Sequence, residues 1–348
     1  MKNKNTYVIG EIGQNHNGSV EIAKLLVDVA SREVKDKLFN NSLKPMDAVK
    51  LTKRDLSQEL SNSQMTRMYD NDNSFGKTYG KHREFLELND EQHFEIYKYA
   101  KGKNLDFVET LCAPGCLSLL KLFVPDKLKV ASRDLTNLPL LTALAETKIP
   151  IIISTGMGGK KEIDDALKVI SKYHSKISIL HCVSEYPTNY ENVNLKTILY
   201  LIESYPNCVI GYSDHTIGIS TPIAAVAMGA EIIEKHITID RLMKGTDQNG
   251  SLAIDGINRM MRDIRNLDLS LGVKDIFIEN SVKVAKEKLE RSIATNKALE
   301  LGEIVQEENL QLLSPGDGLK WIEKNKIIGK KIKNRIEKNE IIYLKDLE

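Results

Sequence analysis

Residues 127–155 read KLKVASRDLTNLPLLTALAETKIPIIIST. Two short runs rich in apolar residues, 127–132 and 150–155, enclose the stretch 138–146, whose apolar residues recur at the spacing of a helix. A strand, a helix and a second strand in this order predict a βαβ unit with parallel strands. The fold class then depends on how often this unit recurs along the chain.

The same alternation extends in both directions. The candidate strands lie at residues 7–12, 47–52, 105–110, 127–132, 150–155, 177–182, 208–213 and 230–236. Helical patterns lie at residues 20–30, 90–101, 138–146, 160–170, 194–204 and 220–229, and in the stretch after Asp255. Eight such units within about 270 residues predict an α/β fold of the (β/α)₈ TIM barrel type. An open doubly wound sheet is the alternative, but it usually has fewer strands and a glycine-rich first turn.

Three parts of the chain depart from this alternation. Residues 32–46 are interpreted as a polar insertion, and residues 53–89 as a long polar loop. Because loops of this length in a compact domain are usually functional or disordered, we expect residues 53–89 to cover an active site. After the barrel (1–275), a charged linker helix (276–290) leads to short strands and turns, which predict a small α+β domain at residues 291–348.

The overall composition excludes several classes of function. The 348 residues are 41% hydrophobic and 28% charged, with a net charge of +1, so we expect no bulk attraction to nucleic acid or to an anionic membrane. No apolar run is long enough to span a bilayer, and the N-terminus lacks the features of a signal peptide. The four cysteines show no framework spacing, which predicts reduced thiols in a cytoplasmic protein.

Polar side chains stand at the carboxyl end of every predicted strand, where TIM barrels place their active sites. One set consists of cations and hydroxyls, which suit a ligand carrying both phosphate and carboxylate: Lys50, Thr110, Lys129, Ser132, Ser154 and Ser213. His215 and His236 follow neighbouring strands and could bind a divalent metal. Taken singly, such a serine or threonine is more often a helix cap, and such a histidine is more often only hydrogen-bonded.

Five motifs at these strand ends resemble those of the bacterial sialic acid (nonulosonate) synthase family. They are EIGQNHNGS at 11–19, ISTGM at 153–157, HCVSEYPT at 181–188, GYSDHT at 211–216 and IEKHITID at 233–240. The C-terminal pattern RSI…GEI…NL…PGDG…IIGKK resembles the antifreeze-like (SAF) domain of the same family. The resemblance covers most of the chain.

The resemblance implies an enzyme that condenses phosphoenolpyruvate with an aldose and releases phosphate. The acceptor would be N-acetylmannosamine or a related diacetamido hexose. The resemblance also implies a divalent metal, typically Mn²⁺ with Mg²⁺ or Co²⁺ as alternatives, and a domain-swapped homodimer. By residue, it implies a metal site at His215 and His236; a phosphoenolpyruvate site at Lys50, Thr110, Lys129, Ser132, Ser154, Ser184 and Ser213; and a sugar site that draws on Glu11, Asp134, Tyr186 and Asp247. We add Thr52 and Tyr79 to the predicted sugar site, and we expect Glu11 or Asp134 to transfer the proton.

Several positions depart from the family pattern. Thr52 stands where glutamine is common, Asp134 where glutamate is common and Ser184 where asparagine is usual. Ser314 replaces the arginine that reaches the sugar's acylamino group across the dimer in this family. We therefore expect the reaction class to be kept, while the acceptor could differ or could lack the N-acetyl group.

Two other functions remain open on the sequence alone. Lys50 or Lys129 could form a Schiff base, as in an aldolase-type barrel. The barrel could also be vestigial and the protein a non-catalytic binding module. The polar groups at all eight strand ends argue against the second alternative. Burying unpaired polar groups costs free energy, and a barrel without catalytic function would have no reason to retain them.

Overall fold

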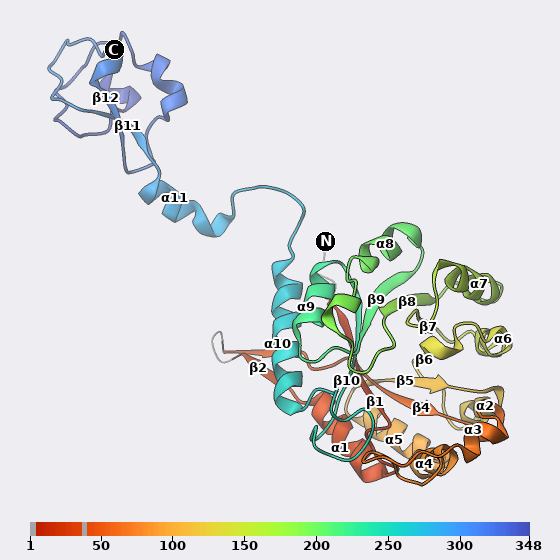
Figure 1. Cartoon of the computed structure of the whole chain (residues 1–348). Helices are drawn as coiled ribbons and strands as arrows, with labels where there is room; N and C mark the ends of the chain where they lie inside the picture. The colour runs from red at the N-terminus through yellow and green to blue at the C-terminus, as the bar shows by residue number, and fades with distance from the viewer. Residues whose placement is uncertain (1–4, 37–39) are drawn as a thin grey trace. The chain divides into compact units, whose positions relative to one another are not determined.

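The computed structural model describes residues 5–36 and 40–348, and within these residues eight parallel strands form one closed barrel (Figure 1). In spatial order the barrel strands are β1 (Tyr7–Gly13), β10 (Ile232–His236), β9 (Val209–Asp214), β8 (Ile177–Cys182), β7 (Ile151–Ser154), β6 (Lys127–Val130), β5 (Asp106–Leu111) and β4 (Ala48–Lys53), after which β4 pairs with β1. Each predicted strand coincides with one of them, so the TIM barrel is confirmed.

Helices surround the strands on the outside of the barrel (Figure 1). They are α1 (Val20–Ser31), α5 (Asp90–Gly102), α6 (Leu138–Glu146), α7 (Lys160–Ile170), α8 (Thr197–Ser204), α9 (Ser220–Ala227) and α10 (Ile254–Ser270). A 3₁₀ helix, η1 (Pro114–Lys121), follows β5 where no helical pattern was predicted. Polar caps start several helices; the side chain of Ser19, for example, accepts a hydrogen bond from the backbone N–H of Ile22 at the start of α1.

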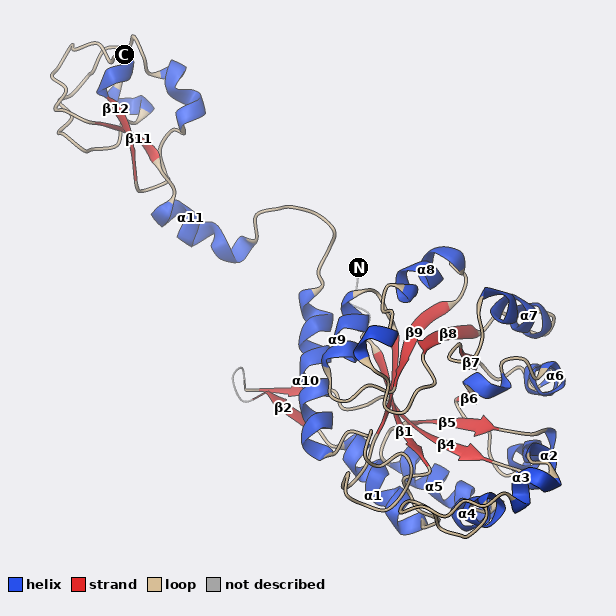
Figure 2. Cartoon of the chain, viewed as in Figure 1, coloured by secondary structure: helices blue, strands red, loops and turns tan. Residues whose placement is uncertain are grey.

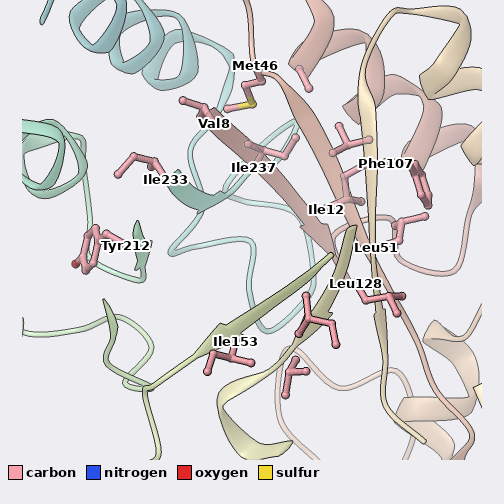
Figure 3. Packing of buried hydrophobic residues seen from close by; sticks show 14 of the residues in the cluster. Val8, Ile12, Met46, Leu51, Phe107, Leu128, Ile153, Tyr212, Ile233 and Ile237 are labelled. Carbon is pink, nitrogen blue, oxygen red and sulfur yellow. The ribbon is translucent and has the colours of Figure 1, made fainter. Parts of the chain in front are cut away.

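The strands have two different faces because side chains alternate along a strand. Outward-facing residues such as Ile12, Phe107 and Ile153 pack in the large core between barrel and helices (Figure 3). Inward-facing residues form a small apolar cluster inside the barrel, made of Ile9, Ala48, Val108, Ile152, Leu180 and Ile232. Two residues further along the same strands stand Glu11, Lys50, Thr110, Ser154, Cys182 and Glu234. The alternation of side chains therefore places a layer of polar residues next to the apolar cluster, toward the carboxyl ends of the strands.

Residues 53–89 are more regular than predicted. They contain α2 (Leu56–Glu59), α3 (Asn62–Thr66) and α4 (Tyr79–Leu86), together with a bridge between Met68 and Thr78. The helix starts are capped by the side chains of Asp55, Ser61 and Thr78, each of which accepts a backbone N–H hydrogen bond. The interpretation as one long loop was wrong because such short helices depend on caps and packing and leave little hydrophobic periodicity in the sequence.

The polar insertion at 32–46 also has structure in its described part. The short strands β2 (Val34–Asp36) and β3 (Asn41–Leu43) form an antiparallel hairpin, and both contact α10. Residues 37–39 lie outside the described residues. The insertion was therefore wrongly interpreted as irregular throughout.

The chain divides into two compact units, one ending at Gly272 and the other comprising Val273–Glu348. The second unit contains α11 (Lys283–Leu289) and a two-stranded sheet of β11 (Ser292–Thr295) and β12 (Leu310–Leu313), connected by loops and 3₁₀ turns (Figure 2). It has a hydrophobic core of its own, which includes Ile293, Val305 and Ile342. None of the helices in the described residues is long and apolar enough to cross a membrane.

Candidate active site

A cavity of about 540 Å³ opens at the carboxyl ends of the barrel strands. The predicted site residues that line it are Glu11, Lys50, Thr52, Tyr79, Thr110, Lys129, Ser132, Ser154, Ser184, Tyr186, Ser213, His215, His236 and Asp247. Asp134 is the one predicted site residue that does not line this cavity. The fold thus brings together side chains that are up to about two hundred residues apart in the sequence, as parallel strands of one barrel require.

The floor of the cavity holds two lysines and two glutamates, all buried. Lys50 Nζ lies 2.8 Å from Glu11 Oε2 and 3.8 Å from Glu234 Oε1, and Lys129 Nζ lies 3.8 Å from the same Glu234 atom. We call these four residues the floor quartet. Their charges balance, which makes their burial tolerable, since a buried unpaired charge costs several kcal/mol.

The two carboxyl groups of the floor quartet differ in acidity because their surroundings differ. Burial raises the pKa of Glu11 to about 7, although Lys50 counteracts it. The pKa of Glu234 is lowered to about 2, because Lys129 and Lys50 outweigh the effect of burial. Glu11 can therefore hold a proton near neutral pH, whereas Glu234 stays ionised.

The two lysines differ as well. Burial tends to lower the pKa of Lys50, but Glu11 and Glu234 beside it raise the pKa overall. Burial lowers the pKa of Lys129 despite the attraction of Glu234. Lys129 also donates a hydrogen bond to Ser154 Oγ at 2.6 Å.

Hydroxyl groups surround the lysines. Lys50 Nζ donates to Thr110 Oγ1 at 3.3 Å, and Ser213 Oγ donates to Glu234 Oε1 at 3.1 Å. The backbone N–H of Gly156 donates to Ser132 Oγ at 3.0 Å. A methyl group at position 156 would lie 2.4 Å from Ser184 Oγ and 2.8 Å from Ser132 Oγ, so the close approach of this backbone requires glycine. Ammonium, hydroxyl and backbone donors thus gather where a doubly charged ligand could bind.

The two predicted metal ligands lie side by side. The rings of His215 and His236 have centroids 5.6 Å apart, and Tyr186 packs 4.0 Å from the His215 ring. Nδ1 of His215 is 2.8 Å from the backbone oxygen of Val183, which fixes the orientation of the ring. Nδ1 of His236 is buried and has no hydrogen-bond partner among the described residues, and burial lowers the pKa of this histidine.

These two imidazoles fit a divalent cation. An imidazole binds metal in its neutral form, which burial favours at His236, and a buried ring nitrogen without a partner is a costly arrangement that a metal would relieve. Within residues 5–36 and 40–348 there is no group of three or more His, Cys, Asp and Glu side chains arranged to hold a metal. The two histidines would therefore leave coordination positions to substrate and water.

Asp134 does not line the cavity, although it ends the 3₁₀ turn η2 (Ser132–Asp134) that follows β6 and whose other two residues do line it. Its carboxylate accepts a hydrogen bond from Arg133 Nε at 3.3 Å. Arg133 also pairs with Glu59 at 3.2 Å and donates to Cys112 Sγ at 3.0 Å. Proton transfer by Asp134 therefore stays a prediction that this geometry does not support.

Several residues that line the cavity had no role assigned from the sequence. Glu234 stands on the inner face of β10, two residues before His236; its place at a strand end was apparent from the sequence, but it was not assigned to the site. Arg54, Tyr69 and Arg83 come from the segment 53–89, and Gln14 comes from the turn after β1. Gln14 lies inside the motif at residues 11–19, and Arg54 was a candidate to replace the arginine that is absent at position 314. Nothing in the local sequence of Tyr69 and Arg83 indicates that they reach the cavity.

Comparisons with known proteins identify the family of this chain. The NeuB family matches residues 43–275, and the SAF domain matches residues 290–348. A closed barrel with a polar site at its strand ends and a C-terminal SAF domain is the architecture of the sialic-acid-type synthases. The chain belongs to the NeuB family.

Two relatives and one solved structure illustrate the similarity. The N,N'-diacetyllegionaminic acid synthase of Campylobacter jejuni is 32% identical over 97% of this chain and 99% of its own length. The N-acetylneuraminate-9-phosphate synthase of Drosophila melanogaster is 34% identical over 76% of this chain and 68% of its own length. The N-acetylneuraminic acid synthetase of Leptospira borgpetersenii, solved with citrate, is 29% identical with a TM-score of 0.67, over 81% of this chain and 90% of that one. These relatives form different products, so the acceptor used by this chain has to be inferred from its own residues.

Proposed function

We propose that this protein condenses phosphoenolpyruvate with an open-chain aldose to give a 2-keto-3-deoxy sugar acid and inorganic phosphate. The observation that carries the proposal is the floor quartet, in which two buried ammonium groups stand among hydroxyl donors at the strand ends. Phosphoenolpyruvate carries a phosphate and a carboxylate on one small carbon frame. Lys50 and Lys129 could each bind one of these anions through charge-assisted hydrogen bonds.

The reaction then follows from the groups that surround the ligand. C3 of phosphoenolpyruvate forms a bond to the aldehyde carbon, water adds at C2, and the hemiketal phosphate loses phosphate to leave the keto group. Lys50 and Lys129 neutralise negative charge that moves toward the phosphate. Glu11, whose pKa is raised to about 7, could hold a proton for the aldehyde oxygen or take one from water.

His215 and His236 would hold a divalent cation, most suitably Mn²⁺. Such a cation, when bound, would polarise the aldehyde oxygen of the acceptor. Tyr186 and Asp247 line the same part of the cavity as the two histidines and would orient the acceptor's hydroxyl groups. By analogy with the family, the small domain would cover the barrel of a partner subunit in a homodimer.

A decisive experiment follows the oxygen atoms. With phosphoenolpyruvate and an aldose in ¹⁸O-labelled water, the released phosphate should contain no label, because water attacks carbon and the bridging oxygen leaves with phosphorus. Release should require both substrates. Labelled phosphate would contradict water addition at C2, and failure with N-acetylmannosamine, mannose, arabinose 5-phosphate and diacetamido hexoses, with metal present, would overturn the synthase assignment.

The Schiff-base alternative makes an opposite prediction. The lowered pKa of Lys129 is a property that a Schiff-base lysine needs, so this alternative has to be tested directly. Treatment with borohydride in the presence of pyruvate should leave the protein mass unchanged. A covalent adduct on Lys50 or Lys129 would favour the aldolase-type mechanism instead.

A further inference from the structure

The covering segment, residues 53–89, contributes one wall of the cavity. Tyr69, Tyr79 and Arg83 line the cavity from this segment, and Gln14 adjoins them. Arg83 lies one turn after Tyr79 on α4, and its guanidinium carbon is 4.9 Å from the centre of the Tyr79 ring. The ring of Tyr69 contacts that of Tyr79 edge-on, with centroids 5.4 Å apart. Because both side chains present hydrogen-bond donors to the cavity, we call Tyr79 and Arg83 the donor wall.

Arg83 differs from the other arginines of the cavity in its partners. Arg54 pairs with Glu59 at 2.6 Å and Glu87 at 3.5 Å, and Arg133 pairs with Glu59 at 3.2 Å. No carboxylate of the described residues lies within ion-pair distance of Arg83, whose hydrogen-bond partners there are the neutral oxygens of Tyr79 and Gln14. A full positive charge therefore stands on this wall without a counter-charge.

The hydrogen-bonding groups that remain free on the donor wall determine what it can bind. A guanidinium has five N–H groups. Nε and Nη2 of Arg83 donate to the Tyr79 hydroxyl at 2.9 and 2.6 Å, and Nη1 donates to Gln14 Oε1 at 2.5 Å, so one N–H on each terminal nitrogen remains. The Tyr79 oxygen already accepts two of these bonds, which leaves its own hydrogen to donate. The groups left over are therefore donors.

A wall of donors with a positive charge selects a particular kind of group. The oxygen of a sugar hydroxyl or of an acetamido group can accept from these donors, but such a neutral group leaves the charge of Arg83 uncompensated. A phosphate monoester offers several oxygen acceptors and a negative charge, which matches the donor wall in both respects. The carboxylate of Asp247, which lines the same cavity and forms no ion pair within the described residues, has the opposite character and suits hydroxyl groups.

The donor wall and the floor quartet come from different parts of the fold. Lys50 and Lys129 belong to barrel strands, whereas Arg83 belongs to helix α4 of the covering segment. A cavity of about 540 Å³ falls within the usual range for ligand sites and has room for two small substrates. Two separate cationic places in one cavity suit two separate anionic groups.

We propose that the acceptor of this enzyme is an aldose phosphate and that Arg83 and Tyr79 bind its phosphate group. This inference rests on the proposed condensation with phosphoenolpyruvate. It also makes Arg83 a determinant of specificity that does not touch the reacting carbons.

The test compares matched pairs of acceptors with saturating phosphoenolpyruvate and Mn²⁺. The pairs are N-acetylmannosamine with its 6-phosphate and mannose with its 6-phosphate. The wild type should show a kcat/KM at least tenfold higher for the phosphorylated member of a pair. Arg83→Met should lower kcat/KM for that member about tenfold to a hundredfold, as expected for a lost charge-assisted hydrogen bond. The unphosphorylated member should be affected less than twofold.

Three controls make the result specific. The KM for phosphoenolpyruvate should stay unchanged in Arg83→Met, Arg83→Lys should restore part of the phosphate preference, and Tyr79→Phe should lose part of it. Wild-type preference for the unphosphorylated member would overturn the proposal and leave the condensation intact. An altered KM for phosphoenolpyruvate in Arg83→Met would place Arg83 in the other substrate's site and overturn it too. Absence of turnover with every acceptor would instead overturn the proposed function.

Discussion

Lys235 Nζ lies 2.6 Å from Asp214 Oδ2, and both side chains are completely buried. Each residue directly precedes one of the paired histidines, since His236 follows Lys235 and His215 follows Asp214. Lys235 also donates to the backbone oxygen of Thr216. The ion pair therefore joins the ends of β10 and β9 at the point where the two imidazoles enter the cavity.

Replacing this pair should alter the site more than the fold. A buried ion pair can often be replaced by apolar residues at little cost, whereas removal of one partner costs about 3–5 kcal/mol. We expect Asp214→Leu with Lys235→Met to stay folded but to bind Mn²⁺ at least about tenfold more weakly, measured by electron paramagnetic resonance without substrates. The matched control is Arg265→Met with Asp47→Leu, a buried pair with an N···O distance of 2.7 Å that joins helix α10 to the residue directly before β4. If both double variants change only thermal stability, the Lys235–Asp214 pair has no positioning role.

Activity should depend on a divalent cation. Dialysis against a chelator should abolish product formation, and Mn²⁺ should restore it, because the two neighbouring imidazoles are suited to metal and the proposed reaction needs polarisation of the aldehyde oxygen. The circular dichroism spectrum of the metal-free protein should be unchanged. Full turnover after removal of the metal would contradict the role assigned to His215 and His236.

His236→Ala should affect kcat far more than stability. Nδ1 of this side chain has no hydrogen-bond partner in the described part of the chain, so its removal should cost little free energy of unfolding. Loss of a metal ligand should lower kcat by about a hundredfold or more, equivalent to about 2.7 kcal/mol of barrier. Steady-state kinetics and thermal unfolding of the same preparation decide the matter. A variant that mainly unfolds would show a structural histidine.

The barrel should be less stable in mild acid than at neutral pH, because the folded protein holds His16 in its neutral form. Burial, together with His93, lowers its pKa from 6.5 to about 4, and its Nδ1 accepts a hydrogen bond from the backbone N–H of Gly18 at 3.0 Å. Between these two pH values the unfolded chain binds a proton that the folded chain does not. The contribution is therefore fully present above about pH 6.5 and is lost as the pH falls toward 4.

The difference between the two pKa values corresponds to about 3 kcal/mol. Urea unfolding of the wild type and His16→Gln at pH 7.5 and pH 4.5 should show a steeper loss of stability in the wild type. Comparing the two proteins cancels opposing contributions such as that of Glu87, whose pKa burial raises to about 7. Identical pH dependence would mean that His16 titrates normally in the folded protein.

A chain ending at residue 280 should keep a folded barrel and lose activity. The main hydrophobic core lies entirely within the first unit, so the barrel needs no packing from the second. The loss of activity is expected because the small domain is proposed to cover the barrel of a partner subunit. Circular dichroism and the phosphate-release assay measure the two properties separately. A truncated chain with full turnover would show that the small domain is dispensable.

The sequence predicted the barrel and the cavity floor because both follow from local alternation. Residues such as Ile152 and Ser154 occupy one face of one strand, and the direction of parallel strands then determines where their polar ends meet. Of the donor wall, Tyr79 was assigned to the sugar site, but Arg83 could not be predicted in this way. Arg83 reaches the cavity through its contact with Gln14, 69 positions earlier in the chain, and through the packing of three short capped helices. The role of Asp134 was assigned from its position after β6, but its carboxylate accepts a hydrogen bond from Arg133 and does not line the cavity.

The floor quartet affects how an anion can bind. Each ammonium group lies within 4 Å of at least one carboxylate, so an incoming anion meets cations that already have partners. Binding is then an exchange of partners, and its free energy is the difference between two sets of ion pairs. Glu11 and Glu234 thus compete with any anionic ligand for Lys50 and Lys129. A simple monoanion gains little by displacing it, whereas a ligand with two anionic ends can replace both carboxylates at once.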